Sequence, residues 1–177
     1  MTKNQIELNF QKLFTTSLTD EDFLRIAYKC AKWLSDDTNT KNGAVLATRS
    51  GDYIPGANHF PDGVEVTPER LDRSCKLDYM IHAEADVIFE AARRGVSTLG
   101  ATLYCPYAAC CNCAQAIVAA GITRVVSHKG IHDLTPERWQ KSINIGHKMF
   151  EEAGVEYVQL DCELGIEHLF SGEMVKL

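Results

Sequence analysis

The chain has 177 residues, of which 45% are apolar, and its formal net charge is −6. A chain of this length fits one domain and can bury roughly 70% of the surface that it exposes when unfolded. No apolar run approaches the ~20 residues of a membrane span. The acidic balance disfavours a protein that coats a nucleic-acid backbone. We therefore expect a globular domain with no membrane partner, for which nucleic acid is a poor candidate ligand.

Seven cysteines, an odd number, occur in the chain. The first residues lack the charged-then-apolar layout of a signal peptide. Both features favour reduced thiols and a cytoplasmic location. Three of the cysteines, Cys110, Cys111 and Cys113, fall within four positions. Cysteines used only as small buried residues would rarely cluster in this way.

The first half of the chain predicts one helix and one hairpin. Residues 20–35 carry apolar side chains at helical spacing, after a Thr19 that suits a helix start. Residues 43–50 and 52–59 are apolar and β-branched around a Ser-Gly-Asp turn, which indicates a hairpin. Residues 59–80 are rich in Pro, Gly and charge, and we expect them to be mainly loop.

The second half alternates between helices and strands with short glycine-marked joints. Helices are predicted at 81–95, 110–121 and 135–154, and strands at 100–106, 122–128 and 155–160. In the last helix we expect Thr135 as N-cap and Pro136 at the first position. This alternation predicts an α/β fold with helices on both faces of a mixed sheet.

Two helix starts carry the residues of a candidate metal site. Cys110 and Cys113 are one helical turn apart, so both sulfurs lie on one side of the helix. His82, at the start of the preceding helix, can supply a third ligand. Three protein ligands leave one coordination position open, which is typical of catalytic zinc. Glu84 is poorly placed to be a ligand beside His82, but it can move protons to and from a water at the open position.

Each motif also has a simpler explanation. A His-Ala-Glu sequence by itself usually marks only a helix start. A single Cys-x-x-Cys in a cytosolic protein indicates a thiol redox site about as often as half of a zinc site. The order of the two motifs, each opening a helix with a strand between them, is what favours zinc, because the two helix starts then meet at one end of a sheet. This order is the zinc-deaminase signature.

On these motifs the chain resembles the cytidine/deoxycytidylate deaminase superfamily, and most closely its deoxycytidylate (dCMP) deaminase branch. The segments TKNGAVL, GANHFPDGV and TPERL, and the stretch after the cysteines, resemble that family as well. The resemblance implies a three-layer α/β/α cytidine-deaminase-like fold with a central mixed sheet. It also implies Zn2+ as cofactor, held by His82, Cys110 and Cys113, and Glu84 as the catalytic residue.

The function that the resemblance implies is hydrolytic deamination of a cytosine nucleotide, most simply dCMP to dUMP with release of ammonia. It places Asn58 near the sugar or base, the backbone N–H of Ala83 against the pyrimidine, and Arg93 at the nucleotide-binding end. We expect a small-molecule nucleotide as substrate and a homo-oligomer as the assembly. Residues 1–18 would form an N-terminal arm, 19–161 the deaminase domain and 162–177 a C-terminal tail.

The chain departs from the family pattern at Asp86, where the family often has Asn. A carboxylate there either repels a 5′-phosphate or holds a basic residue such as Arg93. The first possibility favours an alternative substrate, which would be a nucleoside, a free base or a modified pyrimidine. A catalytically silent zinc or nucleotide-binding module and a thiol oxidoreductase are further alternatives. Cys111 is expected to be a packed residue that does not bind the metal.

Overall fold

The structure, a computed structural model, describes residues 18–177. Its centre is a five-stranded sheet with the strand order β2-β1-β3-β4-β5. The strands are β1 (Gly43–Ala47), β2 (Tyr53–Ala57), β3 (Thr102–Tyr104), β4 (Arg124–His128) and β5 (Glu156–Leu160). β1 runs antiparallel to both β2 and β3, whereas β3, β4 and β5 are parallel to one another. The predicted mixed sheet is confirmed.

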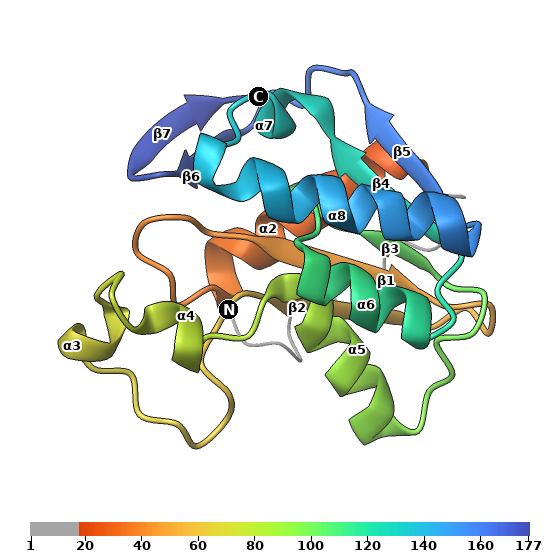
Figure 1. Ribbon diagram of the computed structural model, residues 1–177, viewed down its shortest axis with the longest axis horizontal. Helices are drawn as coiled ribbons and strands as arrows, with labels where there is room; N and C mark the ends of the chain where they lie inside the picture. The colour runs from red at the N-terminus through yellow and green to blue at the C-terminus, as the bar shows by residue number, and fades with distance from the viewer. Residues whose placement is uncertain (1–17) are drawn as a thin grey trace.

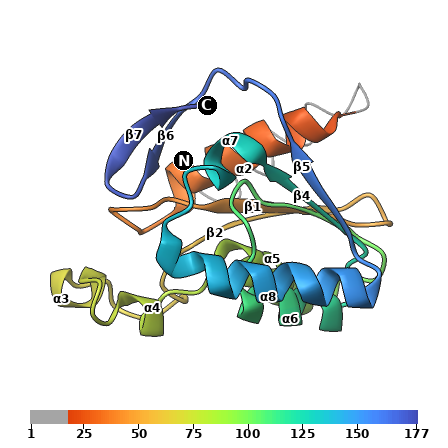
Figure 2. The ribbon, with the colours of Figure 1, turned by 45° about the horizontal axis from the view of Figure 1, so that its top comes forward.

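Helices cover both faces of this sheet (Figures 1 and 2). One face carries α2 (Asp20–Leu34), and the other carries α5 (Ala83–Arg94), α6 (Cys111–Ala119) and α8 (Glu137–Ala153). Figure 2 shows the layers most clearly, with α2 on one side of the strands and α5, α6 and α8 on the other. The predicted three-layer α/β/α architecture is therefore confirmed.

Successive residues of β1 contribute alternately to the hydrophobic clusters on the two faces of the sheet. Val45 packs with Phe23 and Tyr104 in the cluster under α2. Its neighbours Ala44 and Leu46 belong to the larger cluster under α5, α6 and α8. Successive residues of a strand point to opposite faces, so a strand buried on both sides is apolar throughout. This explains why β1 is a continuous apolar run.

The helix starts follow from local hydrogen bonding. At α2, the Thr19 hydroxyl accepts a hydrogen bond from the Asp22 backbone N–H at 3.2 Å, and the Asp22 carboxylate accepts one from the Thr19 N–H at 3.0 Å. This reciprocal capping box satisfies two backbone donors that a helix start otherwise leaves free. The predicted start of α8 is wrong by one residue: Pro136 is extended and serves as N-cap, and the helix begins at Glu137.

The segment 59–80 is mainly loop, as predicted, with two single-turn helices, α3 (Pro68–Leu71) and α4 (Lys76–Tyr79). A third short helix, α7 (Lys129–His132), follows β4. Figure 1 shows α3 and α4 at the same end of the molecule as the start of α8. This end holds the pocket described below.

The C-terminal segment, for which the sequence predicts no element, forms a hairpin of β6 (Glu167–Phe170) and β7 (Glu173–Lys176). Its turn has positive φ at Ser171 and Gly172, as the tight turns that suit hairpins require. Gly172 N donates to the carbonyl of Asn39 at 2.8 Å, and Ser171 N donates to the Thr40 hydroxyl at 3.1 Å. The hairpin therefore supports the loop that precedes β1.

A glycine in α8 allows this helix to approach the start of α6 closely. A Cβ atom at Gly146 would lie 3.0 Å from the carbonyl oxygen of Ala109 and 3.2 Å from the Cβ of Ala114. Both distances are tighter than ordinary van der Waals contacts. The absence of a side chain at this position therefore brings α8 against the helix that carries the cysteines.

Among residues 18–177, no helix combines the length and the apolar character that a membrane span would need. Residues 1–17 of the predicted arm lie outside the described part of the chain. The boundaries of the predicted deaminase domain stay a prediction.

Candidate functional site

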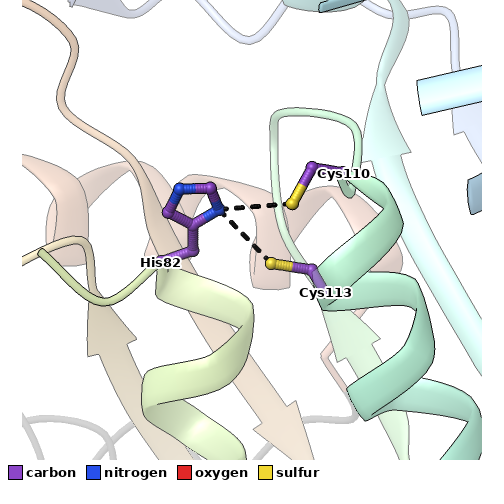
Figure 3. A group of neighbouring side chains, drawn as sticks. All are labelled: His82, Cys110 and Cys113. Carbon is purple, nitrogen blue, oxygen red and sulfur yellow. Dashed lines mark hydrogen bonds between the residues drawn. The ribbon is translucent and has the colours of Figure 1, made fainter. Parts of the chain in front are cut away.

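Three predicted ligands meet where two helices begin. His82 is the N-cap residue of α5 and Cys110 that of α6, and Cys113 lies one turn further along α6. His82 Nδ1 is 3.5 Å from Cys110 Sγ and 3.4 Å from Cys113 Sγ (Figure 3). Figure 3 shows both sulfurs turned toward the imidazole from one side of α6. The one-turn spacing of the cysteines thus produces the juxtaposition that the sequence predicts.

The donor set and its spacing fit a zinc ion. The three ligand atoms all lie within 4.8 Å of one another. Tetrahedral zinc, with Zn–S near 2.3 Å and Zn–N near 2.0–2.1 Å, places a nitrogen and a sulfur ligand about 3.6 Å apart. The two observed nitrogen–sulfur distances lie within about 0.2 Å of that value. Two thiols and an imidazole are also the donors that zinc prefers.

The same three groups strongly perturb one another's protonation. The hydrogen bond with Cys113 and the neighbouring His82 lower the pKa of Cys110 to about 4, although burial opposes the shift. The hydrogen bond with Cys110 raises the pKa of His82 to about 9, and the hydrogen bond between the two thiol groups raises the pKa of Cys113. A thiolate is therefore stabilised in this cluster, and thiolate is the form that binds metals.

Glu84, in the first turn of α5, lies beside the cluster and is only 2% exposed. Its Oε2 atom has no hydrogen-bond partner within residues 18–177. Burial raises the pKa of this carboxyl group to about 7. A buried carboxylate oxygen without a hydrogen-bond partner is energetically costly. Its place beside the three candidate metal ligands therefore fits a group that acts on a small ligand such as water.

His82, Glu84 and Cys110 open onto a pocket of about 90 Å³. Apolar side chains from Met80, Trp139 and Ile143 contribute to its walls. The polar and charged lining residues are Asp37, Asn39, Thr40, Asn42, Asn58, Arg73, Lys76, Tyr107 and Arg138. We call His82, Glu84 and Cys110 the floor of this pocket, and its other polar and charged lining residues the rim. The apolar walls suit a flat ring, and apolar walls with a few polar groups are usual in small-molecule sites.

Asn58 and Ala83, two of the predicted substrate contacts, line this pocket. Ala83 is the first residue of α5, where backbone N–H groups have no partner within the helix. The Asn58 amide already makes several protein contacts. Its oxygen accepts from the Ser35 hydroxyl at 2.6 Å and the Asn42 N–H at 2.7 Å, and its nitrogen donates to the Thr40 carbonyl at 2.8 Å. Substrate contact by either residue stays a prediction.

The structure does not bring Arg93 to this pocket. Arg93 lies in the last turn of α5, at the end opposite His82, and its side chain is 65% exposed. Its guanidinium pairs with Asp62 at 2.9 Å and Glu90 at 3.4 Å. A helix of 12 residues is about 18 Å long, which explains the separation.

Asp86 does not line this pocket either. The Arg93 guanidinium pairs with Asp62 and Glu90, and the Asp86 carboxylate contacts His59 and Ala57. One carboxylate oxygen lies 3.0 Å from His59 Nε2, and the other accepts from the Ala57 N–H at 3.0 Å. Asp86 is buried against β2, where only a glycine fits, because a Cβ at Gly56 would lie 2.5 Å from the carboxylate. Its role here is to join α5 to β2 and to the loop after it.

Cys111 is not part of the His82, Cys110 and Cys113 cluster and contacts Ser142. Its backbone N–H donates to the Ser142 hydroxyl at 3.0 Å, and that hydroxyl lies 3.3 Å from the Cys111 sulfur. His128 is fully buried, with Tyr28 on one ring nitrogen at 2.7 Å and the Cys162 carbonyl on the other at 2.9 Å. Neither residue belongs to the metal-type cluster.

Sequence reasoning missed the charged residues of the pocket rim. Asp37 and Lys76 form a buried ion pair at 2.7 Å, and Arg73 and Arg138 line the same pocket. These residues come from segments distant in sequence and carry no local spacing pattern. The basic character of residues 67–76 was a signal for Arg73 and Lys76, but none marked Asp37.

Comparison with known proteins identifies the family. The model described as "Cytidine and deoxycytidylate deaminase zinc-binding region" matches residues 17–129, which include both helix starts. The "Uncharacterized deaminase in luxG 3'region" of Aliivibrio fischeri is 30% identical over 142 residues, or 80% of this chain and 93% of that protein. A deoxycytidylate deaminase of Enterobacteria phage T2 is 48% identical in a match that covers 58% of this chain and 76% of its own.

Solved structures agree at the level of the fold. The dCMP deaminase of cyanophage S-TIM5 in its apo form superposes with a TM-score of 0.63 at 21% identity, over 80% of this chain and 96% of that one. The same enzyme in complex with dCMP and dUMP also gives a TM-score of 0.63, over 79% and 95% of the two chains. The predicted cytidine-deaminase-like fold is therefore confirmed. With its fold and most of its length matched, the chain belongs to the cytidine and deoxycytidylate deaminase family.

Proposed function

We propose that this protein is a zinc-dependent deaminase that converts dCMP to dUMP and ammonia. The observation that carries the proposal is the cluster of His82, Cys110 and Cys113 beside a pocket that Glu84, with its unpartnered carboxylate oxygen, also lines. A site with only a structural role for zinc would need four protein ligands and no buried acid. Family membership supports the deaminase chemistry.

His82, Cys110 and Cys113 would hold the zinc ion through the imidazole nitrogen and the two sulfurs. When bound, zinc supplies a Lewis acid that makes water easier to deprotonate. The two helix starts favour the anionic ligand forms, since their free N–H groups carry partial positive charge. The starts of α5 and α6 thus both position the three ligands and favour their anionic forms.

Glu84 is the proton carrier of the proposed reaction. It takes one proton from the attacking water and delivers it to N3 of the cytosine ring, and it then carries the second proton from the new C4 hydroxyl to the leaving amino group. A C4–O bond forms, the C4–N bond breaks, and ammonia leaves, so one water is consumed for each uracil formed. The burial of Glu84 keeps bulk water from competing for this proton.

Several observations support a deoxycytidine nucleotide as the substrate. The relative from phage T2 is a deoxycytidylate deaminase, and the cyanophage enzyme has been solved with dCMP and dUMP. The pocket of this chain has walls suited to a pyrimidine, with the predicted contacts Asn58 and Ala83 among its lining residues. The argument for a nucleoside or free base depended on an unpaired Asp86 beside the phosphate, and Asp86 is instead paired with His59.

An ammonia-release assay tests the proposed function. Purified protein with a measured zinc content is given dCMP, CMP, dCTP, deoxycytidine, cytosine and the corresponding purines. We expect turnover of dCMP to exceed that of deoxycytidine by at least tenfold, with about one zinc per chain. A zinc-loaded protein that prefers deoxycytidine or cytosine would replace the proposed substrate, and a zinc-loaded protein inactive on all of them would support a silent binding module. Light scattering tests the predicted homo-oligomer.

A further inference from the structure

The C-terminal hairpin lies outside the part of the chain that matches the family model. That match ends at residue 129, whereas the hairpin consists of β6 (Glu167–Phe170) and β7 (Glu173–Lys176). Among residues 18–177, those that line the pocket all lie between positions 37 and 143. The hairpin therefore does not line the pocket, and any effect that it has on a ligand passes through the residues that do.

The turn of the hairpin is hydrogen-bonded to residues 37–42, which we call the rim loop. Gly172 N donates to the carbonyl of Asn39 at 2.8 Å, and Ser171 N donates to the Thr40 hydroxyl at 3.1 Å. A backbone N–H of the rim loop donates in turn to a carbonyl of β6 at 3.1 Å. These hydrogen bonds hold the rim loop from outside the pocket.

The rim loop in turn holds Asn58, one of the predicted substrate contacts. Asn58 Nδ2 donates to the Thr40 carbonyl at 2.8 Å, and Asn58 Oδ1 accepts from the Asn42 N–H at 2.7 Å. Thr40, Asn42 and Asn58 all line the pocket. A displacement of the rim loop would therefore move the Asn58 amide together with its neighbours in the lining.

A second contact joins the hairpin to the segment that precedes α6. The Phe170 ring, only 4% exposed, packs edge-on against Tyr107, with 5.1 Å between the ring centroids. Edge-to-face packing at this distance is favourable for two aromatic rings. Tyr107 lines the pocket and lies three positions before Cys110. Phe170 thus supports a wall residue close to the cysteine ligands.

We propose that the C-terminal hairpin is a positioning element of the substrate site, with Phe170 and Gly172 as its positioning residues. Phe170 fixes the place of Tyr107, and Gly172 fixes the place of the rim loop and so of Asn58. A site that is already ordered binds its ligand more tightly, because binding does not have to order it. The inference rests on the proposed function and deepens it, because it assigns part of the substrate affinity to a segment beyond the family's zinc-binding region.

Gly172→Ala tests the contact between the turn and the rim loop. A Cβ at Gly172 would lie 3.2 Å from Asn39 Oδ1, so the added methyl group would push the rim loop away from the turn. We expect KM for dCMP to rise about tenfold, with kcat within about twofold of wild type and zinc content unchanged.

Gly165→Ala is the matched control for this variant. Both glycines have positive φ, +65° at Gly165 and +85° at Gly172, so both variants place an alanine in a backbone conformation that favours glycine. Within the described part of the chain, a Cβ at Gly165 would have no neighbour within 4 Å. Gly165→Ala should leave KM and kcat within about twofold of wild type. Equal rises in KM in the two variants would overturn the role of the turn.

Phe170→Ala tests the contact with Tyr107, and Met174→Ala, which shortens a 63% exposed side chain of the same hairpin, is its control. The first should raise KM for dCMP about five- to tenfold with kcat kept, and the second should change neither constant. Phe170→Leu, which keeps an apolar side chain without the ring, is used if the alanine variant does not fold.

A hairpin that only stabilised the fold would give the opposite kinetic pattern. A smaller fraction of folded molecules lowers the apparent kcat, while KM of the remaining active molecules stays at the wild-type value. A lower kcat with unchanged KM in Gly172→Ala and in the Phe170 variants would therefore overturn the proposal.

Binding of the product separates this inference from the proposed function. Calorimetry on zinc-loaded protein should show about tenfold weaker binding of dUMP in Gly172→Ala and Phe170→Ala. Hydrogen exchange of residues 167–176 should slow when dUMP saturates the wild type, because coupling between two sites is reciprocal.

The outcomes distinguish the two proposals. A wild type that shows both effects of dUMP but does not turn over dCMP would refute the proposed function and keep the positioning role. An active wild type whose variants keep full affinity for dUMP would refute the positioning role and keep the function. A wild type that neither binds dUMP nor turns over dCMP would overturn both.

Discussion

The floor and the rim of the pocket are built in different ways. Of the floor residues, His82 and Cys110 are the N-cap residues of α5 and α6, and Glu84 is in the first turn of α5, so backbone geometry fixes their positions. The rim residue Asp37 lies in the loop after α2, and Lys76 is the first residue of the single-turn helix α4. They are held by side-chain hydrogen bonds, since Asp37 accepts from Lys76 and from the backbone of the loop that it starts.

Because of this difference, we expect substitutions in the floor and in the rim to affect different properties of the protein. Changes at the floor should remove the metal or the chemistry, with a smaller effect on the fold, although Cys110 and Cys113 also belong to the hydrophobic core under α5, α6 and α8. Changes at the rim should alter stability and substrate preference while leaving the metal bound. Four predictions test whether the two regions are separable in this way.

The largest effect is expected for the cysteines of the floor. Cys110→Ala and Cys113→Ala should each lose zinc and all measurable turnover, since two remaining ligands hold the ion poorly. Cys111→Ala, the matched control, should keep both, because its sulfur contacts Ser142. Metal analysis after dialysis measures the outcome. Equal zinc loss in all three variants would show that the ligand pair is assigned wrongly.

Glu84→Gln should come next, with turnover lower by ~10²–10⁴-fold and zinc retained. The amide occupies the same volume at this buried position but cannot carry the proton. Turnover and zinc content are measured on one preparation. Loss of the metal together with activity would indicate that Glu84 helps to hold the ion, and full activity would exclude it as the proton carrier.

At the rim, Lys76→Met should lower the free energy of unfolding by ~3 kcal/mol, because it leaves the Asp37 carboxylate buried without its cation. Zinc content should not change. Urea unfolding followed by circular dichroism gives the value, with the exposed Lys148→Met as reference at less than ~0.5 kcal/mol. If the two variants proved equally stable, the ion pair would have no part in ordering the rim.

The smallest effect is expected at Asp86, which lies outside both regions. Asp86→Asn should keep the acceptor for the Ala57 N–H and weaken the contact with His59, at a cost of ~1 kcal/mol in unfolding free energy. The Michaelis constant for dCMP should stay within twofold of wild type. A larger change in either direction would show that the carboxylate senses the substrate phosphate after all.

The floor could be predicted from sequence because its geometry is local. A one-turn spacing and two helix starts are enough to bring His82 and the cysteines together, and the helices were visible in the hydrophobic pattern. The rim could not, since its contacts join distant segments: Asp37 and Lys76 are 39 positions apart. Arg93 shows the limit of reasoning from sequence: it is near His82 in the chain, but the length of α5 separates the two residues.

The hairpin of residues 167–176 escaped prediction for a related reason. Its strands are only four residues each, and one of them is mostly exposed, so no alternation marks them. The arrangement depends on contacts with the loop before β1, such as that from Gly172 N to the Asn39 carbonyl. Short elements of this kind take their structure from tertiary contacts more than from local preference.

The glycine at position 146 has a consequence for the breadth of substrates that the pocket can admit. The helix that carries Arg138 and Trp139 rests on the helix that carries the cysteines where Gly146 meets the Ala109 carbonyl. The spacing of these two helices sets how far one wall of the pocket stands from the other. A methyl group added at position 146 would force α8 and α6 apart. The size of the base that the pocket admits would then depend on a residue that does not contact the base.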